Sequence, residues 1–294
     1  MATSTPASAA PTGSTGPGTG RRPAPAPQRP ARRPGAGRAA WHPTLTLLQL
    51  SAVLAVLLLW AAIAAAGLVS TTALPGPLTV FGQFPGLFGD GAYRQAVTDT
   101  LDGALTGFAA AAVVGIPLGL VTGTYAAAEL SSRLLVDVLR SFPVIALLPV
   151  FLLVLGSTPT TKTTVVFIAC VFPVFLQAQY GARSVTPMIN ETMDAYRVPR
   201  MLRFRKVILP SATPSVMTGL RLAATTSVLV AIGVEVLTTL PGIGHEVVQA
   251  QQGGASARAY AYIVTAGWIG WVITLLSQFA ERRLLRWRPP AHTD

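Results

Sequence analysis

The sequence is poor in cysteine, histidine and charged residues, and each shortage excludes classes of protein. Its only cysteine, Cys170, lies in an apolar stretch and is interpreted as a small buried residue, which excludes a disulfide framework and a thiolate metal cluster. The three histidines, His42, His245 and His292, have no metal-ligand spacing, so we expect no metal site. No glycine-rich phosphate loop followed by Lys-Ser/Thr occurs. We therefore expect the chain itself to bind neither ATP nor another cofactor.

Charged residues make up only 11% of the chain and hydrophobic residues 51%, which is too apolar for an ordinary soluble domain. The net charge of +11 comes mainly from Lys and Arg residues near the two ends and around residue 200. These basic segments flank apolar stretches, an arrangement that indicates membrane topology and argues against a nucleic-acid partner. Polar residues that could converge on a catalytic site are sparse within the apolar stretches. We expect a non-catalytic membrane protein.

Six apolar stretches predict an all-α, polytopic membrane protein with six transmembrane helices. The clearest of them are uncharged runs of about 20 residues, the length that crosses about 30 Å of hydrocarbon. The predicted spans are 45–69, 101–125, 141–155, 163–182, 214–240 and 259–280. They form a predicted membrane domain over residues 45–288.

The segments outside this domain have a different composition. The first 40 residues are rich in Pro, Ala, Gly, Ser and Thr, with six arginines and no acidic residue. Such a sequence cannot bury enough apolar surface to offset its ordering entropy, so residues 1–44 are predicted to form a disordered cytoplasmic tail that is weakly attracted to anionic lipid. Residues 289–294 are predicted to be a short C-terminal tail.

The connections between spans predict further short elements. Residues 71–99 carry several Pro and Gly residues and predict an outer loop with an interfacial helix at 80–87. Residues 240–254 are too long for a tight turn and predict a short re-entrant helix. On the inner side, 126–133 is interpreted as a polar connection, and Asp137 and Arg140 have the spacing of a helical ion pair.

The distribution of Lys and Arg predicts the orientation. With six spans, all 22 Lys and Arg residues except Arg94, Lys162 and Arg258 fall on the side of the two chain ends. The positive-inside rule therefore predicts that both ends are cytoplasmic.

The second span carries a spaced set of small residues. Gly115, Gly119 and Gly123 are four residues apart, with Pro117 between the first two. Glycines one turn apart let two helices approach closely, and proline removes a backbone hydrogen bond. A helix-packing face is the favoured interpretation, and a flexible gating helix is the alternative.

One acidic residue, Glu235, lies deep in an apolar context, in the segment LVAIGVEVLTTL. Ionisable groups in a span usually face the bundle interior or a water-filled cavity. A hydrogen bond between helices near the outer surface is the favoured interpretation. The alternative is a place on a translocation path or gate, for which Pro117, Pro149 and Pro173 are further candidates.

The most distinctive stretch is ETMDAYRVPRMLRFRKVILP, residues 191–210. Its charge alone would indicate only a cytoplasmic loop. Its residue order resembles the cytoplasmic EAA loop of ABC importer permeases, a coupling helix that docks on the ATPase subunit. The resemblance implies a coupling loop over 183–212. Its candidate residues are Glu191, Met193, Ala195, Tyr196, Arg197, Arg200, Met201, Phe204, Leu209 and Pro210.

Among these residues, Met193, Tyr196 and Met201 are the candidate apolar anchors for the partner. The stretch departs from the family pattern at Arg197, which stands where the family has a glycine. Glycine there would allow a left-handed turn between two short helices, which arginine adopts poorly. Arginine therefore disfavours a bend at this position, and Pro199 offers another break.

Other stretches are similar to the aliphatic-sulfonate, nitrate and taurine branch of these permeases. They are LPGPLTVF, GIPLGLVTG, RSFPVIALLPVFLLVLG, YGARSVTPMINET, the Glu235 region with PGIG, and ERRLLRWR. The resemblance implies a multi-pass subunit of the bacterial cytoplasmic membrane that pairs with a second copy. Two cytoplasmic ATPase subunits that use ATP-Mg and an extracytoplasmic binding protein complete the assembly that it implies.

Under this reading the outer segments 71–99 and 240–254, with Arg94 and Glu246, form the surface that meets the binding protein. A secondary carrier or channel that ATP does not power is the alternative, although it leaves the order of residues 191–210 unexplained. The transported solute is not readable from the sequence. Small organic or inorganic anions such as sulfonates, taurine or nitrate are what the resemblance suggests, and thiamine-precursor-like molecules are a further candidate class.

Overall fold

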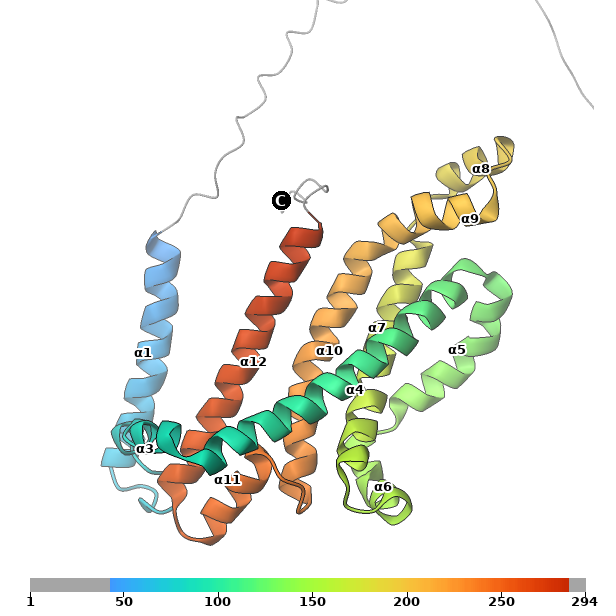
Figure 1. Ribbon diagram of the computed structural model, residues 1–294. Coiled ribbons are helices and arrows are strands. Elements are labelled where there is room, and N and C mark those ends of the chain that lie inside the picture. The colour runs from blue at the N-terminus through green and yellow to red at the C-terminus, as the bar shows by residue number, and fades with distance from the viewer. Residues whose placement is uncertain (1–42, 286–294) are drawn as a thin grey trace, which may run out of the picture. The chain divides into compact units, whose positions relative to one another are not determined.

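The structure, a computed structural model, describes residues 43–285 (Figure 1). The predicted disordered tail, apart from residues 43 and 44, and the C-terminal tail 289–294 lie outside the described residues. The chain divides into two units. The described part of the first, residues 43–50, is the beginning of α1 (Pro43–Ala65), and the second unit, from Ser51 onward, holds every other described element.

All regular elements of the described part are helical, as predicted. They begin with α1 (Pro43–Ala65), α2 (Pro77–Phe81), α3 (Phe84–Gly89), α4 (Gly91–Thr124), α5 (Ala126–Ser141), the 3₁₀ turn η1 (Val144–Leu147) and α6 (Leu148–Leu155). They continue with α7 (Pro159–Arg183), α8 (Pro187–Ala195), α9 (Arg200–Arg203), the π-helical turn η2 (Phe204–Ile208), α10 (Leu209–Leu237), α11 (Ile243–Gln252) and α12 (Ser256–Leu284).

Five helices of the described chain are long and apolar enough to cross a membrane, and a bent pair makes a sixth span if it is counted as one. The five are Leu47–Ala65, Gly91–Thr124, Pro159–Arg183, Arg200–Leu237 and Ser256–Leu284. The prediction of six spans is therefore confirmed when the bent pair is one span, with the helices generally longer than expected.

The third span differs most from its prediction. The expected polar connection at 126–133 is helical, and the pair Ala127–Ser141 and Val144–Leu155 is bent by 76°. The bend lies at Phe142 and Pro143, because the residue before a proline is driven out of the α-helical region, and Phe142 has ψ of 129°. The predicted ion pair on α5 is present, with Arg140 Nη2 3.0 Å from Asp137 Oδ1.

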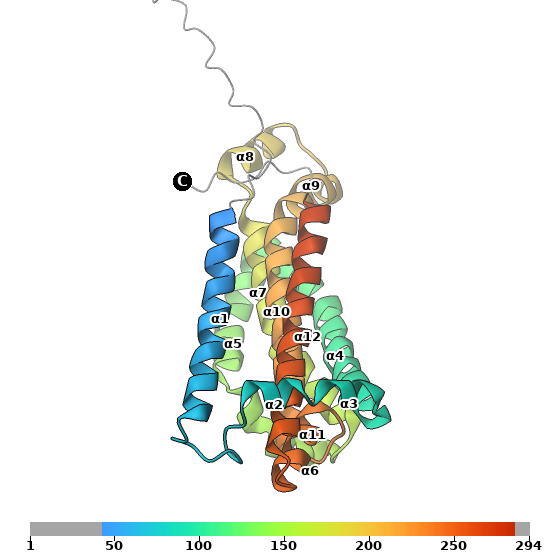
Figure 2. The same cartoon turned by 90° about the vertical axis from the view of Figure 1, so that its left-hand side faces the viewer.

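The expected loop 71–99 is shorter than predicted. The predicted interfacial helix at 80–87 is present as the two short helices α2 and α3, which lie across the direction of the long helices (Figure 2). The loop ends at Asp90, whose side chain accepts a hydrogen bond of 2.9 Å from Ala92 N and caps α4. The second span therefore begins at Gly91, ten residues earlier than expected, because this capping signal lies within the polar stretch.

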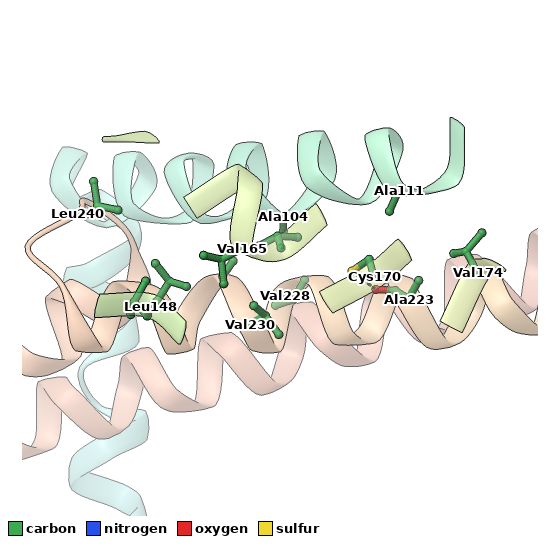
Figure 3. Close-up of a cluster of buried hydrophobic side chains, with 13 residues drawn as sticks. Ala104, Ala111, Leu148, Val165, Cys170, Val174, Ala223, Val228, Val230 and Leu240 are labelled. Atoms are coloured by element: carbon green, nitrogen blue, oxygen red, sulfur yellow. Dashed lines mark hydrogen bonds between the residues drawn. The ribbon is translucent and has the colours of Figure 1, made fainter. Parts of the chain in front are cut away.

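The core of the second unit is built where α4 packs on α7 and both contact α10. Figure 3 shows the buried cluster between these helices, which includes Ala104, Val165, Cys170, Val174 and Ala223. Cys170 is fully buried, and its thiol donates a 3.3 Å hydrogen bond to the carbonyl oxygen of Ala223.

Small residues at every fourth position of α4 let it lie against α7. This small-residue stripe consists of Gly103, Gly107, Ala111, Gly115, Gly119 and Gly123. A Cβ atom at Gly107 would lie 2.6 Å from Val166 Cγ1, and one at Gly123 would lie 2.7 Å from Ala182 Cβ. The stripe is thus the packing face that the three predicted glycines indicated, and it is twice as long as the sequence analysis recognised.

We expect Gly107→Ala to destabilise the protein by about 1–3 kcal/mol, because the added carbon would also lie 2.9 Å from the backbone oxygen of Thr163, which cannot rotate away. Gly267→Ala on α12 is the matched control, since nothing lies within 4 Å of its Cβ position. Thermal unfolding of the full chain in detergent measures both. Equal midpoints for the two variants would contradict the close-packing account.

Candidate coupling loop and buried ion pair

The segment between α7 and α10 folds into two short helices joined by a tight turn. The helices α8 and α9 lie together at one end of the bundle (Figure 1). The helix that starts at Arg200 runs through η2 into α10 and ends at Leu237, a continuous 38 residues. Only residues 184–186 and 196–199 of the predicted loop 183–212 are outside helices. The closing Val207 to Pro210 of the motif therefore lies within the candidate membrane span Arg200–Leu237.

Arg197 forms the left-handed turn that the glycine of related loops would supply. Its φ is +50°, and it is the one non-glycine residue with positive φ in the described chain. Two backbone hydrogen bonds close the turn, from Arg197 N to Asp194 O at 3.0 Å and from Val198 N to Met193 O at 2.9 Å. This pair of bonds is the Schellman arrangement that ends a helix. The bend between the two short helices is present, and it lies at Arg197.

Side-chain contacts explain why the turn tolerates arginine. Met193 is 7% exposed, and Val198 packs against the same buried cluster, which supplies the hydrophobic contact that accompanies a Schellman motif. Arg203 ties the two helices together across the turn. Its Nη1 donates to Asp194 Oδ1 and its Nη2 to Asn190 Oδ1, both at 2.8 Å.

The candidate loop residues divide into an exposed face and a packed face. Glu191, Ala195, Tyr196, Arg197, Arg200, Met201 and Leu209 are exposed, whereas Met193, Phe204 and Pro210 are buried or partly buried. Tyr196 is 81% exposed and Met201 69%. Met193 was expected as an apolar anchor for a partner. Its side chain instead packs inside the chain, because it belongs to the turn that holds α8 in place.

The other candidate group, Glu235, is fully buried and pairs with Lys162. Glu235 Oε1 lies 3.0 Å from Lys162 Nζ, and the two side chains are 0% and 4% exposed. The ammonium group donates two more hydrogen bonds, to Asp99 O at 2.8 Å and Pro241 O at 3.1 Å. All three of its N–H donors are therefore used.

The second carboxylate oxygen of Glu235 is also satisfied. Oε2 accepts from the Thr100 hydroxyl at 2.9 Å and from Gly244 N at 3.0 Å, and the Thr100 oxygen accepts from Ile243 N at 2.9 Å. A Cβ at Gly242 would overlap the Glu235 carboxyl group, so the PGIG segment has glycine where it passes the carboxylate. The sequence analysis favoured a hydrogen bond between helices as the role of Glu235. The structure shows such bonds, and they join α4, α7, α10 and α11.

Lys162 was missed as a partner. It was assigned to an outer loop, whereas it lies in the first turn of α7. A signal for this existed. Thr158 followed by Pro159 is a helix-start pattern, and the Thr158 hydroxyl oxygen accepts from Thr161 N at 3.4 Å. Helix α7 therefore begins before Lys162, so the lysine is part of the helix and its side chain is buried.

The three candidate prolines occupy different environments. Pro117 is an exposed residue in the interior of α4, Pro149 lies in the first turn of α6, and Pro173 is half-buried in the interior of α7. None of them belongs to the hydrogen-bonded network around Glu235.

The comparison with protein families identifies the chain at this point. The model of the family described as "Binding-protein-dependent transport system inner membrane component" matches residues 115–288. The chain belongs to this family. The match covers more than half of the chain and includes the loop, the Arg197 turn and Glu235.

The chain is also similar to individual proteins that are named as transport permeases. The chain is 28% identical over 257 residues to the putative aliphatic sulfonates transport permease SsuC of Bacillus subtilis, covering 87% of this chain and 91% of that one. It is 27% identical over 218 residues to the nitrate import permease NrtB of Leptolyngbya laminosa, covering 71% and 78%. It is also 27% identical over 276 residues to the bicarbonate transport permease CmpB of Synechococcus elongatus, covering 88% and 98%.

A solved structure shares the fold. The inward-facing MetNI methionine ABC transporter matches with a TM-score of 0.57 and 19% identity, over 66% of this chain and 95% of that chain. This likeness concerns the fold alone. The family match and the named relatives make the chain a multi-pass inner-membrane permease subunit of an ABC importer.

The Arg197 turn predicts opposite effects for two substitutions. Arg197→Gly should keep the turn and stabilise it by up to about 1 kcal/mol, since an L-residue in the left-handed region costs about 1–2 kcal/mol and glycine loses part of this gain through chain entropy. Arg197→Val should open the turn, because β-branched residues are rare at positive φ. Hydrogen exchange at the Val198 amide measures both. Faster exchange in the glycine variant than in the wild type would contradict the assignment.

The buried ion pair predicts a strong, non-additive effect on stability. Lys162→Met or Glu235→Gln alone should lower the free energy of unfolding by about 3–5 kcal/mol, because each leaves a buried polar partner unpaired. The double variant should lose clearly less than the sum of the two. Arg140→Gln, which breaks an exposed pair, should cost at most about 1 kcal/mol. Denaturant unfolding in detergent measures all four, and additive losses would refute the coupling.

Proposed function

We propose that this chain, with a second copy, forms the translocation path of an importer powered by separate ATPase subunits that bind the exposed face of residues 191–201. The observation that carries the proposal is the continuous helix Arg200–Leu237, with the loop at one end and Glu235 at the other. At 1.5 Å per residue, its 38 residues span about 57 Å.

This helix offers a mechanical route between the two ends. A displacement of α8 is carried to α9 by the rigid turn at Arg197 and by the hydrogen bonds of Arg203. It then passes along α10 to Glu235, which is bonded to α4, α7 and α11. A stiff helix transmits a tilt without absorbing it, so nucleotide-driven motion at the loop would rearrange the opposite end. Pro117, Pro149 and Pro173 are proposed as points where the path-forming helices bend.

The exposed face of the loop has the chemistry of a docking surface. Tyr196 and Met201 are apolar anchors, and Glu191 supplies a charged group near them. Aromatic residues contribute strongly where they enter a partner's pocket. The buried Met193 supports this face from behind and keeps it rigid, which lowers the entropy cost of docking.

The outer end is the proposed surface for the binding protein. The segments 71–99 and 240–254 are held together there by a buried cluster that includes Val80, Tyr93, Ile243 and Tyr262. Glu246 Oε2 accepts a 3.2 Å hydrogen bond from the Tyr262 hydroxyl. Exposed Arg94 is the charged residue more available for a partner. The proteins named for sulfonate, nitrate and bicarbonate transport suggest a small oxyanion as the solute.

Tyr196→Asp tests the docking face. We expect the variant to insert normally but to lose at least tenfold in co-purified, vanadate-sensitive ATPase activity, because a carboxylate would be desolvated in an apolar groove. The assay is a gentle-detergent pull-down of the tagged full chain from native membranes. Tyr196→Phe, which keeps the ring, is the control and should retain the ATPase. An unchanged ATPase yield with Tyr196→Asp would refute the docking assignment, and no ATPase with the wild type would favour a carrier or channel.

A further inference from the structure

A polar cavity of about 250 Å³ lies between α5 and the half of α7 nearest the loop. Its lining includes Arg133, Arg140, Arg183, Glu129, Asp137 and Gln179. It is separate from the exposed docking face and from the buried Glu235 pair. Its volume is several times the roughly 30 Å³ that one water molecule occupies, so a small solute fits.

The charges around the cavity leave one arginine uncompensated. Arg140 pairs with Asp137 at 3.0 Å, and Arg183 pairs with Glu129. Arg133 is an exposed residue and has no ion-pair partner among residues 43–285. The three arginines and two carboxylates that line the cavity give it a net charge of +1, which one monovalent anion would neutralise.

Gln179 adds a polar side chain to the lining of the cavity. Gln179 is 7% exposed, and its side-chain amide has no hydrogen-bond partner in the described part of the chain. No buried side-chain nitrogen or oxygen atom of the described residues lacks a hydrogen-bond partner, so this amide keeps access to solvent and its N–H groups are available to a solute. The residue is also held in place, since its backbone oxygen and Cα lie against Gly123 of the small-residue stripe.

We infer that this cavity binds a small monovalent oxyanion, with Arg133 supplying charge and Gln179 supplying N–H donors. The planar guanidinium group can donate two parallel hydrogen bonds to two oxygens of one anion, the geometry offered by nitrate, bicarbonate or a sulfonate. The inference rests on the proposed function only for the suggestion that this anion is the imported solute. Binding itself can be tested without transport.

A lipid phosphate carries the same chemistry, so the source of the oxyanion must be separated by experiment. The full chain is placed in nanodiscs of zwitterionic phosphatidylcholine, or in nanodiscs that also contain phosphatidylglycerol. Each is titrated by calorimetry with sodium nitrate, sodium bicarbonate and sodium methanesulfonate at constant ionic strength, with sodium chloride as the comparison salt. The variants are Arg133→Gln, Arg133→Lys, Gln179→Leu and the control Arg282→Gln, an exposed arginine near the end of α12.

We expect saturable binding of at least one oxyanion in the zwitterionic discs, and no comparable chloride binding. Arg133→Gln and Gln179→Leu should each weaken it at least tenfold, Arg133→Lys should weaken it less than Arg133→Gln, and Arg282→Gln should leave it unchanged. Unchanged affinity in both cavity variants would overturn the site. No saturable oxyanion heat in the zwitterionic discs would overturn the free-anion inference. Oxyanion binding that is present in the zwitterionic discs and lost in those with phosphatidylglycerol would show that the lipid headgroup competes for the cavity.

The site and the proposed function can fail separately. If an ATPase co-purifies with the wild type and Arg133→Gln transports with unchanged KM, the cavity is not on the path while the importer assignment stands. If no ATPase co-purifies, the importer mechanism fails, and the calorimetric titration still decides whether the cavity binds an anion.

Discussion

The close approach of α4 to α7 is the contact on which the rest of the structure depends. Glycine or alanine at every fourth position of α4 brings the two backbones together over most of the length of the helices. The same stripe makes room for the buried ion pair, because a Cβ at Gly103 would lie 2.6 Å from Lys162 Cε. At its other end the stripe fixes Gln179 at the polar cavity. In a membrane, where water drives no hydrophobic association, such packing is the main source of helix affinity.

Rigidity at both ends of α10 complements this contact. At the loop, the Schellman turn and the two hydrogen bonds of Arg203 join α8 to the helix that becomes α10. At the opposite end, Glu235 connects α10 to three other helices through Lys162, Thr100 and Gly244. An isolated carboxylate there would be costly, and its full satisfaction makes the junction specific in geometry. The polar groups therefore lie at the two junctions where α10 is bonded to its neighbouring helices.

Hydropathy explains which spans were predicted correctly, and helix caps and proline explain where the predicted helix boundaries were wrong. The apolar runs placed five spans correctly in number and order, because length and hydropathy dominate membrane insertion. Helix starts were placed too late at Gly91 and Pro159, since the Asp90 and Thr158 caps lie in polar segments that hydropathy ignores. The bend at Pro143 was missed for the opposite reason. The apolar run continues through it, although the proline there ends the helix.

The sequence by itself determined the helical membrane fold, the basic loop and the small-residue spacing, because each depends on residues close together along the chain. Only the tertiary structure decided that Lys162 pairs with Glu235, which is 73 residues away, and that Gln179 and Arg133 line one cavity. It also decided that Arg197 adopts a left-handed conformation that its own propensity disfavours. In each case a contact between separate helices, or a closed set of hydrogen bonds, outweighs the local preference of the residue.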